Sequence, residues 1–329
     1  MTETFQVEDS VEVAVVERSG FIESRHAGSA VVISPAGDIV RTVGDIASPV
    51  FPRSALKPFQ AVAVMSSGVT LRGTDAAIAT ASHSGTARHV DLVRGVLARA
   101  GVPESALACP EAYPQDVAAR DAVVRANGAK SPLYMNCSGK HAAMLAACAA
   151  NGWPLEGYLD MEHPLQKRIL DIVERFTGER PAATGIDGCG APVHAISLTA
   201  LARGIQRVTT STPSSPFAIY REAGALTEAV REHPWVIAGP GLGDSITIER
   251  LGVFSKYGAE GSIVMTAPDG TTVAAKVLDG NTRVVHAVAL RLLVQAGALD
   301  ADAVAPVLEE LDLWVTGGAG RVGRIRATV

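Results

Sequence analysis

The feature that most constrains the fold is a change of hydrophobic periodicity along the chain, from strand-like to helical and back again. Runs of β-branched residues separated by turn sequences predict strands at residues 11–17, 29–34 and 39–43. Helical spacing starts at Ser54 and predicts a first helix ending near Gly68. Further helices are expected at residues 87–100, 117–126, 140–150, 164–176, 193–202, 217–233 and 282–299, and further strands at 262–266, 272–277 and in a tail near 323–328.

This order of elements excludes the regular strand–helix alternation of a doubly wound fold. It predicts an α+β fold in which N- and C-terminal strands share a mixed or antiparallel sheet covered by helices. No internal repeat and no linker-like segment interrupts the sequence. Residues 1–329 are therefore expected to form a single unit, with a helical subdomain around residues 85–235.

Composition and charge exclude several classes of protein. Hydrophobic residues make up 47% of the 329 positions, which is enough for a large core and excludes intrinsic disorder. The net charge of −5 and the lack of a Lys/Arg block argue against nucleic acid as a partner. The longest apolar-rich stretch, residues 142–150, is far short of the roughly 20 residues that span a bilayer. With no secretory leader visible at the N-terminus, a cytoplasmic location is expected.

Lysine is scarce, with six lysines against 23 arginines, so each lysine invites a chemical explanation. An ammonium group loses its proton when it is desolvated, whereas a guanidinium does not. Ser54 and Lys57 form a Ser-x-x-Lys motif at a predicted helix start, where residues three apart face the same side. A buried Lys57 could then accept the proton of the Ser54 hydroxyl and generate a nucleophile.

A second polar cluster, Thr80-Ala-Ser82-His83-Ser84-Gly85, is predicted at a strand-to-helix turn. Its small hydroxyl groups suit either the anchoring of a carboxylate or amide, or simple N-capping of the next helix. Lys276 is predicted on a strand that is followed by the tight turn Asp279-Gly-Asn281. Its side chain could point across to a serine on a helix or out into solvent.

The cysteines divide into two groups. Cys109 and Cys148 are expected to be small core residues. Cys137 and Lys140 lie three apart at a predicted helix entrance, and Cys189 lies in a glycine-rich segment. Two thiolates that meet in space would bind Zn²⁺ or another soft metal, although the spacing is not that of a zinc knuckle.

Taken in order along the chain, these segments resemble the asparaginase II family, the Rhizobium etli-type L-asparaginases. The matching pieces are Arg53-Ser-Ala-Leu-Lys-Pro58, Ala81-Ser-His-Ser84, Asn136-Cys-Ser-Gly-Lys-His141, Gly185-Ile-Asp-Gly-Cys189 with Pro192, and Lys276 with Asp279-Gly-Asn281. The resemblance implies one catalytic unit with a fold similar to serine β-lactamases and penicillin-binding proteins. It also implies hydrolysis of the side-chain amide of L-asparagine to aspartate and ammonia.

The resemblance further implies a role for each matching residue. Ser54–Lys57 and Ser82–Lys276 would form two catalytic Ser–Lys pairs, in which a serine is acylated and then released by water. Cys137, Lys140 and Cys189 would be zinc ligands, and Arg53, His83 and Asp187 would contact the substrate. The family resemblance also leads us to expect a homodimer.

Three questions stay open at the level of sequence. Either Ser54 or Ser82 has the chemistry to be acylated, and either asparagine or glutamine could be preferred. A different Ser-x-x-Lys acyl hydrolase, similar to β-lactamases or peptidases, is one alternative function. A non-catalytic, zinc-dependent amino-acid-binding or regulatory protein on the same scaffold is the other.

Overall fold

The computed structural model describes residues 3–329. The strands are β1 (Val11–Arg18), β2 (Phe21–Ile33), β3 (Ile39–Val43), β4 (Pro49–Val50), β5 (Ala183–Ile186), β6 (Pro192–Ser197), β7 (Phe254–Gly258), β8 (Ser262–Thr266), β9 (Thr272–Val277), β10 (Trp314–Gly317) and β11 (Gly320–Ala327). The helices are α1 (Lys57–Met65), α2 (Thr74–Thr80), α3 (Ala87–Arg99), α4 (Val117–Arg125), α5 (Ser138–Asn151), α6 (Pro164–Thr177), α7 (Leu198–Thr209), α8 (Ala218–Glu232), α9 (Pro234–Ile237), α10 (Gly243–Leu251), α11 (Val285–Gln295) and α12 (Ala301–Glu310). The short 3₁₀ turn η2 (Arg53–Leu56) leads directly into α1.

N-terminal and C-terminal strands form one sheet with the order β10-β11-β1-β2-β9-β8-β7, in which β3 also pairs with β2. Every pairing in this sheet is antiparallel. The predicted α+β architecture, with both ends of the chain in a shared sheet, is therefore confirmed. A second, small sheet has the order β4-β6-β5.

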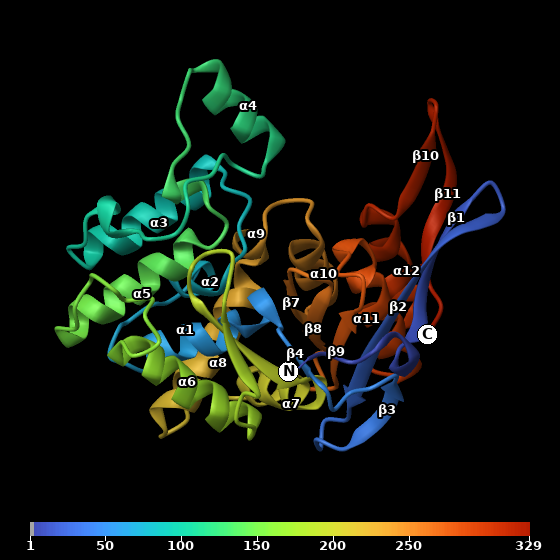
Figure 1. The fold of residues 1–329 in the computed structure, drawn as a ribbon, viewed down its shortest axis with the longest axis horizontal. Coiled ribbons are helices and arrows are strands. Elements are labelled where there is room, and N and C mark those ends of the chain that lie inside the picture. The colour runs from blue at the N-terminus through green and yellow to red at the C-terminus, as the bar shows by residue number, and fades with distance from the viewer. Residues whose placement is uncertain (1–2) are drawn as a thin grey trace.

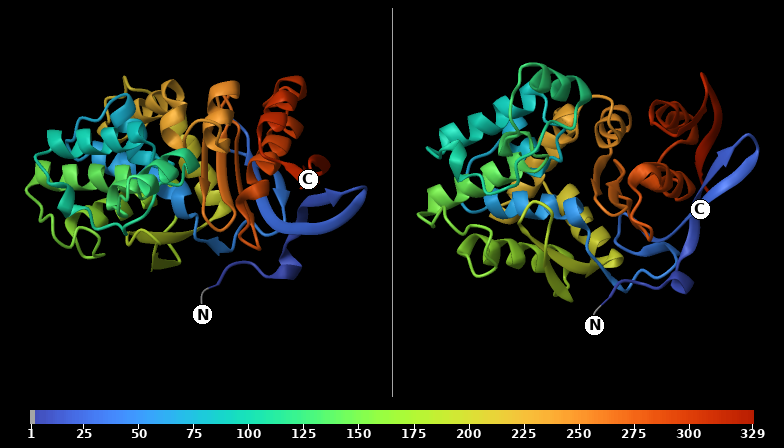
Figure 2. Two further views of the ribbon diagram at one scale, coloured as in Figure 1. Left: turned by 90° about the horizontal axis from the view of Figure 1, so that it is seen from above. Right: turned by 45° about the horizontal axis from the view of Figure 1, so that its top comes forward.

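Both faces of the central part of the sheet are covered by helices (Figures 1 and 2). Val31 and Ile33 of β2 face a core that is shared with α1, α5 and α7, whereas Ala30 and Val32 face a separate core built with α11 and α12. Burial on both faces explains why consecutive residues in the middle of β8 and β9, residues 263–265 and 273–275, are apolar. The helices α1–α6 lie together on one side of the sheet, as Figure 1 shows.

Close packing between helices places the polar segments next to one another. Helix α5 approaches α2 so closely that a Cβ added at Gly139 would lie 2.4 Å from the carbonyl oxygen of Ile78. Only glycine allows this approach, which brings Cys137 and Lys140 to the extended segment that follows α2. None of the described helices is long and apolar enough to cross a membrane.

Two sequence predictions of local structure are wrong. The helix predicted at 193–202 is strand β6 followed by helix α7, because Ser197 caps the helix by accepting a hydrogen bond from the backbone N–H of Ala200. The apolar run before Thr80 is helix α2 rather than a strand. Short apolar runs do not distinguish a buried helix from a buried strand by periodicity alone.

Candidate active site

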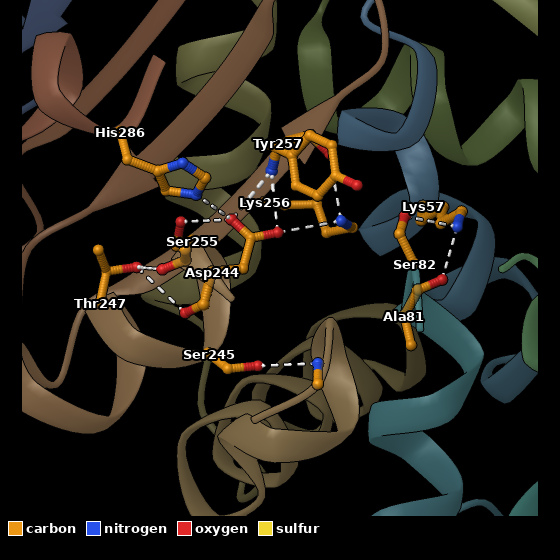
Figure 3. Close-up of polar contacts among 12 residues, drawn as sticks. Lys57, Ala81, Ser82, Asp244, Ser245, Thr247, Ser255, Lys256, Tyr257 and His286 are labelled. Atoms are coloured by element: carbon orange, nitrogen blue, oxygen red, sulfur yellow. Dashed lines mark hydrogen bonds and ion pairs between the residues drawn. The ribbon is translucent and has the colours of Figure 1, made fainter. Parts of the chain in front are cut away.

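A buried Ser–Lys pair lies where α1 meets the segment after α2. The Lys57 ammonium donates hydrogen bonds to Ser82 Oγ at 2.8 Å and to the carbonyl oxygen of Ala81 at 2.5 Å (Figure 3). Lys57 is 1% exposed and Ser82 is 3% exposed. The backbone N–H of Ser82 bonds the carbonyl of Ile237, which fixes the serine against α9. The structure thus pairs Lys57 with Ser82.

Ser54 lies one turn before Lys57, in η2, and its hydroxyl makes no hydrogen bond within residues 3–329. The predicted Ser54–Lys57 contact is not formed, because the buried ammonium needs acceptors and finds two together at Ala81 and Ser82. Ser54 is only partly buried, unlike Ser82. Of the two serines, Ser54 is therefore the one whose hydroxyl has no partner in the described part of the chain.

The second predicted pair, Ser82–Lys276, is not hydrogen-bonded either. Lys276 is on β9, where its cross-strand neighbours are Ser29 and Ser262, and its ammonium donates to the carbonyl of Val277. Burial lowers the pKa of Lys276, against the opposing effect of nearby carboxylates. The reason for the mismatch is topological: β7, and not β9, is the strand that packs against η2.

A lysine that the sequence analysis did not single out is close to the Ser–Lys pair. Lys256, on β7, is fully buried, and Figure 3 shows it between Asp244 and the Lys57–Ser82 pair. A sequence signal existed, because Lys256-Tyr-Gly258 resembles the Lys-Thr-Gly motif that accompanies Ser-x-x-Lys in penicillin-recognising enzymes. Gly258 has a steric reason: a Cβ there would lie 2.1 Å from the carbonyl oxygen of Pro52, just before η2.

The charges around Lys57 favour its neutral form. Burial is the main cause that lowers the pKa of Lys57, and the nearby ammonium groups of Lys256 and Lys140 lower it further. The Cys137 thiolate acts in the opposite direction, and the resulting pKa is about 8. A substantial fraction of Lys57 amines is therefore unprotonated in mildly alkaline solution, as a general base requires.

The Lys256 ammonium is bonded to the Asp244 carboxylate, with Nζ 3.2 Å from Oδ2. Asp244 is itself fully buried and also accepts hydrogen bonds from Ser255 and His286. Burial by itself would raise the pKa of the Asp244 carboxyl. The ammonium of Lys256 and the hydrogen bond from His286 overcome this effect and hold the pKa well below its usual range.

This depressed pKa predicts a loss of stability in acid. A carboxyl whose pKa is lower in the folded state adds stability at every pH above its unfolded pKa of about 3.9. That contribution is lost progressively as the pH falls below this value. In urea titrations at pH 7 and pH 3, we expect the difference in free energy of unfolding between the wild type and Asp244→Asn to shrink at pH 3. An unchanged difference would contradict the prediction.

The residues predicted to contact substrate have distinct environments. His83 is fully buried, with Nε2 2.9 Å from Ser138 Oγ and Nδ1 accepting the backbone N–H of Gly85. Both ring nitrogens are thus used within the fold, and burial lowers the pKa of His83 well below its ordinary value. In this structure His83 shapes the segment that carries Ser82 and leaves no ring nitrogen for a ligand.

Arg53 and Asp187 join two segments of the site. Arg53 contacts Asp187 Oδ1 through Nε at 2.7 Å and through Nη2 at 2.6 Å. The backbone of Arg53 has φ = +54°, a strained conformation for this residue directly before Ser54. Burial raises the pKa of the Asp187 carboxyl, but the Arg53 hydrogen bond and the Lys140 charge overcome it, so the net pKa is lowered. The ion pair ties the turn after β5 to η2.

The predicted metal ligands Cys137, Lys140 and Cys189 lie together in the core. Lys140 Nζ donates to Cys189 Sγ at 3.1 Å, and the Cys137 thiol donates to Asn136 Oδ1 at 3.3 Å. Cys137 and Cys189 belong to one small buried cluster. The neighbouring Cys189 and the charges of Lys57 and Lys140 lower the pKa of the Cys137 thiol, against the opposing effect of burial. The neighbouring Cys137 and burial raise the pKa of the Cys189 thiol. Burial lowers the pKa of Lys140, but the negative charge on the sulfurs more than offsets burial and raises it.

This donor set fits a soft divalent metal. Two sulfurs and one amine in mutual contact, with all three side chains buried, match the ligand preference of zinc. Within residues 3–329, no group of three or more His, Cys, Asp and Glu side chains is arranged to hold a metal. A metal at this place therefore needs the Lys140 amine as its third protein ligand, in the neutral form.

Fold and site together define a class: an α+β protein whose buried Ser–Lys pair lies beside a thiol–amine cluster. The profile of the L-asparaginase II family matches residues 14–327, and the chain belongs to that family. Membership of this family makes the protein an amidohydrolase that acts on a small molecule. No curated protein matches the chain.

Solved structures with similar folds have low sequence identity. A β-lactamase from Mycobacterium bovis is 16% identical, with 83% of this chain and 95% of that chain covered, and a TM-score of 0.43. A Bacillus glutaminase is 12% identical, with coverages of 82% and 91% and a TM-score of 0.46. Mglu in its native form is 13% identical, with coverages of 84% and 66% and a TM-score of 0.45.

Proposed function

We propose that this amidohydrolase cleaves the side-chain amide of L-asparagine through a covalent acyl-enzyme. The observation that carries the proposal is the buried contact between Lys57 and Ser82, together with the unpartnered hydroxyl of Ser54 on the preceding turn. A serine hydroxyl and a lysine with a lowered pKa are the two groups that nucleophilic acyl transfer needs.

In the proposed reaction Ser54 Oγ attacks the carboxamide carbon, because its hydroxyl is not engaged by the protein. The proton of the attacking hydroxyl passes through Ser82 Oγ to the neutral Lys57 amine, because Ser82 is the serine that is hydrogen-bonded to Lys57. The C–N bond breaks and the proton passes to the leaving nitrogen, so ammonia departs. Water then attacks the ester carbon, releases aspartate and returns the proton to Ser54.

Other charged residues support this geometry. The Arg53–Asp187 pair holds the turn that carries Ser54 in place. Lys256 takes the place that the sequence analysis gave to Lys276, since it adjoins the Lys57–Ser82 pair. The Cys137–Lys140–Cys189 cluster is proposed to hold zinc, which when bound would polarise or orient the substrate. No proton transfer in the scheme depends on the metal.

The first test is the release of ammonia from candidate substrates by the purified wild-type protein. We expect release from L-asparagine, with L-glutamine measured in parallel and a chromogenic β-lactam as a third substrate. Turnover of the β-lactam without ammonia release would favour the alternative acyl hydrolase. Saturable binding of asparagine with no product would favour the non-catalytic alternative, and either outcome overturns the proposal.

A further inference from the structure

Donors from strand β7 and helix α11 meet at one carboxylate on helix α10. Asp244, on α10, accepts hydrogen bonds at Oδ1 from Ser255 Oγ on β7 at 2.8 Å and from His286 Nε2 on α11 at 2.9 Å. Its other oxygen, Oδ2, faces the ammonium of Lys256 (Figure 3). The backbone N–H of Tyr257 also donates to the carboxylate. Donors thus hold both carboxylate oxygens in place, and they orient Oδ2 toward the Lys256 ammonium.

The backbone next to His286 leaves room for its ring at one glycine. A Cβ added at Gly243 would lie 2.6 Å from Cε1 of the His286 ring and 2.9 Å from its Nε2. The imidazole therefore packs against Gly243, the residue directly before Asp244, where any side chain would collide with the ring. Because a carboxylate can only accept, His286 Nε2 carries the proton and donates it to Asp244.

The ammonium of Lys256 needs a carboxylate partner such as Asp244, because it lies in a fully buried position close to a second amine. Its only other polar or cation–π contacts among the described residues are with the carbonyl of Tyr257 at 3.1 Å and the ring of Tyr257, whose centroid is 4.7 Å away. On the other side lies Lys57, whose pKa the charge of Lys256 lowers, after the larger effect of burial. Two ammonium groups repel in a buried site, so without a carboxylate the Lys256 amine would move away or lose its proton.

We propose that Asp244 and His286 are positioning residues, which hold the Lys256 amine beside the Lys57–Ser82 pair. Asp244 supplies the charge, and His286 fixes the carboxylate so that Oδ2 faces the amine. The role of Lys256 in turnover rests on the proposed function, whereas its placement by Asp244 and His286 does not. Neither positioning residue touches the Ser–Lys pair itself.

The kinetic test compares two substitutions of His286. His286→Leu removes the donor and keeps the bulk, whereas His286→Gln can return an N–H near the position of Nε2. We expect kcat for asparagine hydrolysis to fall by roughly 10- to 100-fold in His286→Leu with KM within about twofold, since displacement by about 1 Å can cost that much. His286→Gln should recover most of the loss. Asp244→Asn should lower kcat at least as far as His286→Leu.

A matched control is available in Glu222, a largely buried carboxylate on α8 that Arg72 binds through both guanidinium nitrogens. Glu222→Gln removes an ion pair whose arginine side chain is about half exposed and which does not involve Asp244, His286 or Lys256. Its kcat should match the wild type. An equal loss of kcat in Glu222→Gln would mean that the effect is general destabilisation, which overturns the proposal. So would His286→Leu with wild-type kcat, or His286→Gln with no recovery.

Crystal structures of the wild type, Asp244→Asn and His286→Leu separate this proposal from the proposed function. We expect the Lys256 amine to shift away from its wild-type position in both variants. If the wild type released no ammonia, the proposed function would fail, and these structures would still decide the positioning claim. An unmoved Lys256 amine in both variants would overturn it.

Discussion

Lys57→Met is expected to abolish ammonia release, lowering kcat/KM by roughly 10⁴-fold or more, the scale seen when a nucleophile–base unit loses one member. Methionine fills a similar volume but cannot accept a proton. The substitution leaves Ser82 Oγ and the carbonyl of Ala81 without their donor, a cost of about 1–3 kcal/mol for each buried group. It also removes a buried charge, which offsets part of that cost. The variant should therefore fold, and its melting temperature should be measured with its activity.

The control for this prediction is Lys167→Met, which removes an exposed lysine that pairs with Glu162 on the surface. Exposed pairs contribute little to stability, so both activity and melting temperature should stay close to those of the wild type. Ser54→Ala and Ser82→Ala test which of the two serines is acylated. If Ser54 is acylated, Ser54→Ala should show no covalent adduct by mass spectrometry. Lys57→Met with full activity would contradict the mechanism.

The architecture could be predicted from the sequence because its signals are strong and local. Long periodic segments such as Ala87–Arg99 and Pro164–Thr177 carry both a helical apolar stripe and a capping residue before them. The strands Ser262–Thr266 and Thr272–Val277 surround a turn that contains Asp269 and Gly270. Periodicity assigns strand β6 to a helix, because β6 runs into α7 without a turn and only the cap at Ser197 marks the boundary.

The site was harder to predict, because its pairings depend on which strand lies beside η2. Three contacts join segments that are far apart in the sequence: Lys57–Ser82, Lys140–Cys189 and Arg53–Asp187. Lys276 and Lys256 both lie on strands of the same sheet, and periodicity does not reveal which strand is at the edge next to η2. Gly258, two residues after Lys256, is a signal that favours Lys256 over Lys276. A glycine inside a strand often marks the close approach of another backbone, and here that backbone is Pro52, just before η2.

The second large effect is expected for metal binding by the cysteine–lysine cluster. After incubation with zinc and removal of the excess, the wild-type protein should retain about one zinc per chain, measured by elemental analysis. Cys137→Ser and Cys189→Ser should each retain almost none, because each removes one of only two thiolates and leaves a hard oxygen donor instead. Zinc should also raise the melting temperature of the wild type, since a ligand that binds only the folded state stabilises it.

Cys148→Ala is the matched control for the zinc measurement, because Cys148 is a fully buried thiol on the same helix as Lys140 and makes no polar contact among the described residues. It should retain zinc like the wild type and lose only packing energy. Zinc retention in Cys137→Ser equal to that of the wild type would place the metal elsewhere. Wild-type protein that retains none would leave the two thiols and the Lys140 amine as a purely hydrogen-bonded cluster. The amine would then be protonated, because the negative charge of the neighbouring cysteines stabilises an ammonium and raises the pKa of Lys140 against the effect of burial.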